Sequence, residues 1–116
     1  MGFTHYVDGH VAFTTDQWAT FIRLCQQIFE NTKVPLAGWD GAAGTKPVVN
    51  FERVSFNGVE DDAHETCVIL RRAESFTFCK TAHMPYDSVV VAVYKAVRDI
   101  LPDTVLSSDG GDEVFD

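Results

Sequence analysis

Two histidines and two cysteines have the spacing of a metal site. Two residues separate His64 from Cys67 and three separate Cys79 from His83, and imidazole and thiolate groups at such spacings are typical zinc ligands. The two pairs fall on consecutive predicted strands. If a tight turn joins these strands, side-chain alternation places Cys67 and Cys79 on opposite faces. We therefore predict no metal and no other cofactor, although a single β-bulge would bring the four groups together.

The same region offers a thiol nucleophile, because His64 and Glu65 are groups that could activate Cys79. A nucleophile of this kind usually lies in a sharp turn beside glycine, with an oxyanion-binding loop near it. The neighbours of Cys79 are Phe78 and Lys80, and no such turn or loop is visible. The sequence therefore favours a protein without catalytic residues, and an enzymatic role stays open.

A polar pocket at one end of the predicted sheet is a sharper candidate. Its members are His64, Glu65, Lys80, Thr81, Tyr86 and Asp87. Alternation places Lys80 on the same strand face as Phe78, where its simplest role is to extend along apolar surface or to pair with Asp87 or Glu65. The alternative is that the six residues converge on a small molecule or nucleotide.

The segment 33–47 is too rich in glycine and proline to form a regular element. Its composition is similar to that of a phosphate-binding loop, but such a loop needs Gly-Lys-Ser/Thr at the start of a helix. Here Lys46 precedes Pro47 and a predicted strand. We interpret the segment as a flexible loop in which Trp39 and Asp40 are candidates for contact with a partner protein. Trp39 could equally fold back over the core.

The charge balance is acidic. Nine Lys and Arg against 17 Asp and Glu give a formal net charge of −8, which argues against a nucleic-acid binder held by phosphate contacts. The acidic residues that we consider candidates for binding a basic partner surface are Glu60, Asp61, Asp62, Asp109 and Asp112. Such clusters can equally be solvated ends that keep the protein soluble.

Two helices and about four strands are predicted around these residues. Thr14 and Gln17 form a capping box before an apolar stripe that indicates a helix over 15–31, and Pro85 suits the first turn of a helix that Pro102 ends. Strands are predicted over 3–13, 48–57, 65–72 and 75–81, with an optional short strand over 105–107. The order β-α-β-β-β-α predicts an α+β fold, an antiparallel sheet with two helices packed on one face.

The predicted core lies between the helices and the sheet. It consists of Trp18, Phe21, Ile22, Cys25 and Phe29 against Phe56, Phe78, Val90, Val93 and Val97. With 116 residues the chain suits a single domain, which we place at 1–104, followed by an acidic and flexible C-terminal tail over 105–116.

The location that the sequence suggests is the cytoplasm. Neither a signal peptide nor an apolar stretch long enough to span a membrane is visible, so no membrane association is expected. The three cysteines, Cys25, Cys67 and Cys79, are an odd and scattered set that favours a reducing compartment. The oligomeric state stays open.

Four short motifs resemble a family of small uncharacterised proteins encoded by bacteriophages and prophages. They are Ser55-Phe56-Asn57-Gly58, Ala63-His64-Glu65-Thr66, Phe78-Cys79-Lys80-Thr81-Ala82 with Pro85-Tyr86-Asp87, and Ser107-Ser108-Asp109-Gly110. The family carries no assigned activity, cofactor or catalytic residue. The resemblance implies expression inside an infected bacterium, where small acidic proteins often bind and disable host factors.

Two functions are therefore considered. The first is a small acidic phage-type protein that engages and inhibits or modulates a host bacterial protein. The alternative is a protein that binds or processes a small molecule or nucleotide in the pocket at the end of the sheet.

Overall fold

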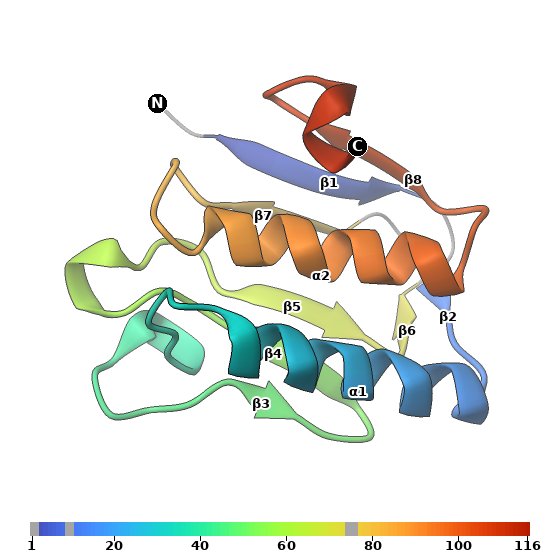
Figure 1. Cartoon of the computed structure of the whole chain (residues 1–116), viewed down its shortest axis with the longest axis horizontal. Coiled ribbons are helices and arrows are strands. Elements are labelled where there is room, and N and C mark those ends of the chain that lie inside the picture. The colour runs from blue at the N-terminus through green and yellow to red at the C-terminus, as the bar shows by residue number, and fades with distance from the viewer. Residues whose placement is uncertain (1–2, 9–10, 74–76) are drawn as a thin grey trace.

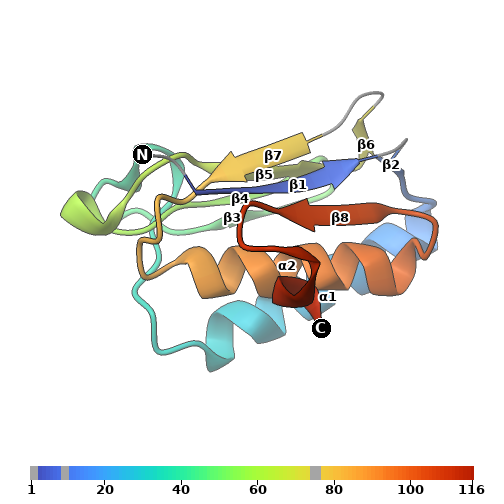
Figure 2. The same cartoon turned by 90° about the horizontal axis from the view of Figure 1, so that it is seen from above.

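The computed structural model describes residues 3–8, 11–73 and 77–116, which form an α+β fold with two helices on one side of the strands (Figures 1 and 2). The elements are β1 (Thr4–Asp8), β2 (Val11–Ala12), α1 (Thr15–Asn31), η1 (Trp39–Gly41), β3 (Val48–Val49), β4 (Arg53–Phe56), η2 (Glu60–Asp62), β5 (Cys67–Leu70), β6 (Arg72–Ala73), β7 (Thr77–Lys80), α2 (Asp87–Ile100), β8 (Val105–Ser108) and η3 (Asp112–Phe115). Among the described residues, neither helix is long and apolar enough to cross a membrane.

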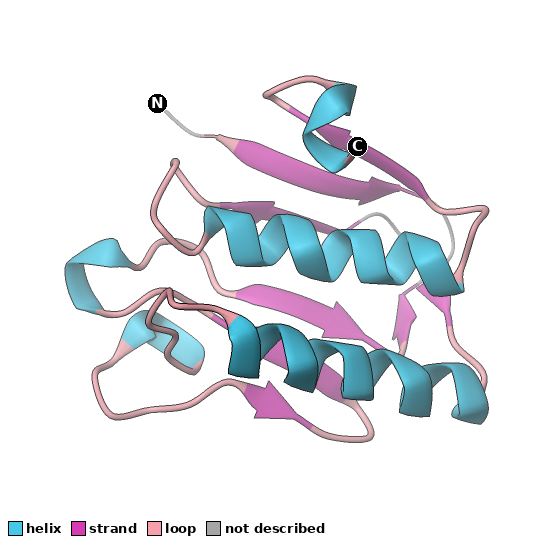
Figure 3. Ribbon diagram, viewed as in Figure 1, coloured by secondary structure: helices cyan, strands magenta, loops and turns pink. Residues whose placement is uncertain are grey.

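The strands form three small antiparallel sheets rather than one sheet of about four strands (Figure 3). Their orders are β7-β1-β8, β3-β4-β5 and β2-β6. The expected antiparallel pairing of the strand over 48–57 with the strand over 65–72 is observed as β4 with β5. The expected direct pairing of the strand over 65–72 with the strand over 75–81 is replaced by the longer-range pairing of β7 with β1. The two larger sheets meet where the Glu65 N–H donates to the Lys80 carbonyl oxygen at 3.2 Å.

Helix α1 has the bounds and the cap that the sequence predicts. The Thr14 hydroxyl accepts the Gln17 N–H at 3.1 Å, and the Gln17 side chain accepts the Thr14 N–H at 2.9 Å. This reciprocal pair satisfies two donors that would otherwise be free at the helix start. The helix then buries Trp18, Phe21 and Cys25 against the sheet.

The core lies between the helices and the strands, as predicted, with one error on β7. Phe78 lies on the face away from the helices and is 40% exposed, while Cys79 is buried in the core. The register with β1 explains this, because Cys79 lies opposite the fully buried His5 and Phe78 lies opposite Tyr6. Residues opposite each other in a ladder share a face, so the facing of β7 follows that of β1.

The C-terminal segment is part of the domain rather than a flexible tail. Strand β8 pairs with β1, with Ser108 opposite His5, and η3 buries Phe115 to 1% exposure. The Arg98 side chain donates to the Phe115 carbonyl oxygen at 2.8 Å. The prediction of a single domain ending at residue 104 is therefore too short.

Candidate functional site

The residues that the sequence singles out gather where β5, β7 and the start of α2 meet, but they do not converge on one pocket. The segment around His64 is held by the side chain of Asn57. Its side-chain amide donates to the His64 carbonyl oxygen at 3.0 Å and to the Thr66 hydroxyl at 3.1 Å. Its side-chain oxygen accepts N–H groups from Gly58 and His64. His64 is thus held through its backbone, and the residue is exposed to solvent.

Tyr86 joins the two larger sheets. It is fully buried, and its hydroxyl donates to the carbonyl oxygens of Glu65 at 2.6 Å and Lys80 at 3.3 Å. The Glu65 carboxylate accepts the Lys80 N–H at 2.8 Å. Burial, together with the nearby Cys79, raises the pKa of the Tyr86 phenol well above its ordinary value. These contacts make Tyr86 a structural anchor rather than a ligand-binding group.

Thr81 and Asp87 belong to a second network, built around His5. The His5 ring is fully buried; its Nε2 lies 2.6 Å from Asp87 Oδ1, and its Nδ1 lies 2.8 Å from Ser108 Oγ. The Thr81 hydroxyl donates to the same Asp87 oxygen. Burial alone would raise the pKa of Asp87, but the hydrogen bonds from His5 and Thr81 outweigh it and hold that pKa below its ordinary value.

Sequence reasoning missed two members of this network, His5 and Ser108. The available signal was weak: a histidine in a predicted strand among aromatic and β-branched residues. Because Ser108 was assigned to a tail, nothing in the sequence brought it next to residue 5. The pairing of β1 with β8 supplies that contact.

All three cysteines are free and buried. Cys67 and Cys79 both lie in the core, against the prediction that they face opposite sides, because β5 and β7 belong to different ladders and the parity of a simple hairpin does not apply. Burial raises the pKa of Cys25 to about 12 and that of Cys67 well above its usual range. No group of three or more His, Cys, Asp or Glu among the described residues is arranged to hold a metal ion.

Both helices lie on one side of the strands and leave the other face of the sheet uncovered (Figure 2). On that uncovered face, residues of β5 and β7 line a groove. Its volume is about 360 Å³, and its lining residues are Glu65, Thr66, Val68, Leu70, Thr77 and Phe78. Leu70 is 46% exposed and Phe78 is 40% exposed. We call this surface the open-face groove. A second groove, of about 520 Å³, lies between the helices and includes Leu24, Ile28 and Lys95 in its lining.

The predicted acidic surface is divided. Glu60, Asp61 and Asp62 form η2 and are exposed. Asp109 instead has a structural role, because its carboxylate accepts the Thr4 N–H at 3.0 Å. Asp112 begins η3, which lies apart from η2 (Figure 1).

The loop residues Trp39 and Asp40 are both exposed. Trp39 does not fold back over the core; it is 54% exposed, and the Arg53 guanidinium lies 5.9 Å from the centre of its ring. Asp40 has a left-handed backbone with a φ of 72°. Both remain available for contact with a partner.

No protein-family model, curated protein or solved structure matches this chain. The structure alone therefore defines the class of this protein. It has an α+β fold in which the helices cover one face of the sheet and leave the other face open. The resemblance to phage-encoded proteins stays a prediction.

Proposed function

We propose that this protein is a binding module of the phage type that engages a host bacterial protein through the open-face groove. The observation that carries the proposal is the exposure of Leu70 and Phe78 around a hollow in the uncovered face of the sheet. Antiparallel sheets often face water on one side, where polar side chains are expected. Large apolar side chains gathered at a groove on such a face favour a protein contact.

The partner segment that fits best is extended and basic. The groove runs between two strands, so an extended chain can place alternate side chains against Val68, Leu70 and Phe78. Glu65 lines the same groove, and η2, with its three exposed carboxylates, lies just before it in the chain. Lysine or arginine side chains flanking an apolar residue in the partner would complement both features.

The alternative, a small-molecule pocket, has less support because several of its candidate residues bind other groups of the protein. Tyr86 is buried, and its hydroxyl donates to two backbone carbonyl oxygens. Thr81 and Asp87 are turned toward His5. Among the six predicted pocket residues, Glu65 lines the open-face groove, and this position serves a protein contact equally well.

The test is capture of partners from a bacterial lysate on immobilised wild type and on two matched variants. The first variant is Leu70→Ser combined with Phe78→Ser. The control is Val105→Ser, which removes a side chain that is 61% exposed but lies on β8, away from the groove. Truncation of central apolar contacts typically costs about 2 kcal/mol or more, or about 30-fold in affinity.

The expected result is a protein retained by wild type and by the Val105 variant and lost from the double variant. Retention of the same proteins by all three, or equal loss from the control, would show that the groove is not the binding surface. Circular dichroism checks that each variant is folded.

Charge provides a second test on the same captured partner. Reversal of Asp61 and Asp62 to lysine should slow association and reduce its dependence on salt, because exposed charges act over about 8–10 Å at physiological ionic strength. Asp103→Lys, an exposed change after the end of α2, is the control. An unchanged association rate in the double reversal would remove η2 from the binding surface.

A further inference from the structure

The second network, around His5, has the arrangement of an activated nucleophile. We propose that Ser108 is a reactive serine, with His5 as its base and Asp87 as the group that orients the base, and that it accepts acyl groups from small carboxylic esters. This site is separate from the open-face groove and does not depend on the proposed binding function.

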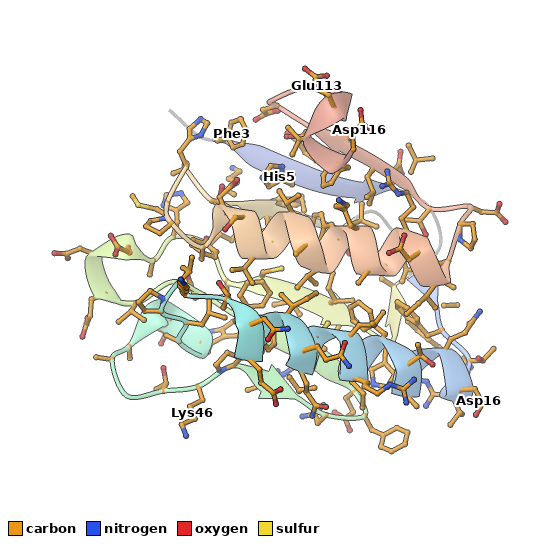
Figure 4. All side chains as sticks on the ribbon, in the orientation of Figure 1. Phe3, His5, Asp16, Lys46, Glu113 and Asp116 are labelled. Atoms are coloured by element: carbon orange, nitrogen blue, oxygen red, sulfur yellow. The ribbon has the colours of Figure 1, made fainter. Side chains whose placement is uncertain are left out.

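The three side chains are brought together by elements far apart in the sequence. Ser108 and His5 lie opposite each other on β8 and β1, and Asp87 is the first residue of α2. The distances are 2.8 Å from Ser108 Oγ to His5 Nδ1 and 2.6 Å from His5 Nε2 to Asp87 Oδ1. Figure 4 marks His5 on β1, close to the start of the chain.

The Asp87 carboxylate fixes one of the imidazole protons. Its pKa is held below the ordinary value, so it is ionised and accepts a hydrogen bond from Nε2–H of His5. When the imidazole is neutral, Nδ1 carries the lone pair and the Ser108 hydroxyl donates to it. This is the form of the ring that the proposal uses, because a general base needs that polarity in order to activate a serine. The ring is reversed relative to the usual serine–histidine–aspartate arrangement, because Nδ1 rather than Nε2 faces the hydroxyl.

Ser108 is the less buried member of the pair, because it is half-buried whereas His5 is fully buried. Phe3 and Phe115 cover the imidazole, with ring centres 5.1 and 5.7 Å away. Gly110 lies against Phe3 so closely that an added Cβ would come 2.7 Å from the ring. These apolar neighbours suit a small apolar acyl group rather than a charged one.

The turn after β7 holds the orienting group. Ala82 and His83 both have left-handed backbones, with φ values of 51° and 60°, a conformation that costs energy for residues other than glycine. The turn places the Thr81 hydroxyl against the Asp87 oxygen that His5 also contacts. Asp87 is thereby fixed in one orientation toward the imidazole.

The reaction balances without any further reagent than ester and water. Ser108 Oγ forms a bond to the ester carbonyl carbon while its proton passes to His5 Nδ1. The ester C–O bond breaks, and that proton leaves with the alcohol. Water then attacks the acyl carbon while one of its protons passes to His5 Nδ1, the bond from Ser108 Oγ to the acyl carbon breaks, and that proton returns to Oγ as the carboxylic acid leaves. The Gly110 N–H donates a hydrogen bond to Ser108 Oγ at 3.0 Å and so fixes the position of the attacking oxygen.

The test uses 4-nitrophenyl acetate with the intact protein, followed by peptide mapping of the acetyl group by mass spectrometry. We expect a stoichiometric burst of 4-nitrophenol followed by slow turnover, with the acetyl group on Ser108. Ser108→Ala should abolish the burst. Ser107→Ala is the matched control, because Ser107 is also half-buried but pairs with Tyr6 on the opposite face of β8.

Mapping of the wild type decides the question even if Ser108→Ala fails to fold. Acetylation at Ser108 that disappears when the wild type is unfolded in urea supports the proposal. The absence of a Ser108 adduct, or equal modification of Ser107 and Ser108, overturns it.

Discussion

The two faces of the sheet differ in how deeply their apolar side chains are buried. On the face toward the helices, Trp18, Phe21 and Cys25 are fully buried against the strands. On the opposite face, Leu70 and Phe78 remain 46% and 40% exposed around a groove. Alternation along each strand assigns every residue to one face or the other. The covered face therefore holds the fully buried core of the domain, and the open face leaves part of its apolar surface in contact with water.

The largest contrast should appear in stability. Phe21→Ala on the covered face should lower the free energy of unfolding by about 3–5 kcal/mol, because it removes buried area and leaves a cavity. Phe78→Ala on the open face should cost less, about 1 kcal/mol, since the residue is already 40% exposed in the folded protein. Urea denaturation of both variants measures the difference. Equal losses would mean that both faces contribute to one core.

The polar network of the covered face should have the next largest effect. Asp87→Asn removes the charge in the hydrogen bond from His5, at a cost of about 1.5–3 kcal/mol. The pKa of Asp87 is lowered in the folded state from its ordinary value of 3.8. Its contribution to stability is therefore present above that pH and is lost as the pH falls through the lower folded value.

The measurement is the unfolding free energy of wild type and Asp87→Asn between pH 6 and about 2.5, with Asp103→Asn, an exposed site, as control. Wild type and the control should lose stability in acid more steeply than Asp87→Asn does. Parallel pH profiles for all three would show that the Asp87 carboxylate is not stabilised by folding.

The two buried tyrosines sharpen the comparison within the covered face. Tyr86→Phe should cost about 1–3 kcal/mol, because it leaves the buried carbonyls of Glu65 and Lys80 without the phenol that bonds them. In the described structure the Tyr94 hydroxyl is buried with no hydrogen-bond partner. Tyr94→Phe should therefore be neutral or stabilising in the same thermal or urea unfolding assay. A large loss in Tyr94→Phe would reveal a partner for its hydroxyl.

Local signals in the sequence were enough for some elements and not for others. The capping box of Thr14 and Gln17 and the stripe that follows it predict α1 with its bounds, because both act within a few residues. Phe78 was assigned to the wrong face because the facing of β7 depends on β1, more than 70 positions earlier. Contacts across such distances leave no periodic trace in one sequence.

The candidate site shows the same division. Asp61 and Asp62 lie at the surface, as their polar composition predicts. For Trp39 the sequence left open both exposure and folding back over the core, and the structure shows it exposed. The network of His5 with Ser108 was missed, because its members come from the two ends of the chain and meet only through the pairing of β1 with β8. Tyr86 was a candidate pocket residue because it is close in sequence to Lys80, Thr81 and Asp87, whereas in the structure its buried hydroxyl bonds backbone carbonyl groups.

Hydroxyl-radical footprinting of the captured complex tests the role of the open face most directly, because it reports the solvent exposure of individual side chains with and without the partner. We predict that oxidation of Leu70 and Phe78 falls on binding while that of Val105, which is 61% exposed on β8, stays the same. Unchanged oxidation of Leu70 and Phe78, with protection of Leu24 and Ile28 between the helices instead, would contradict it.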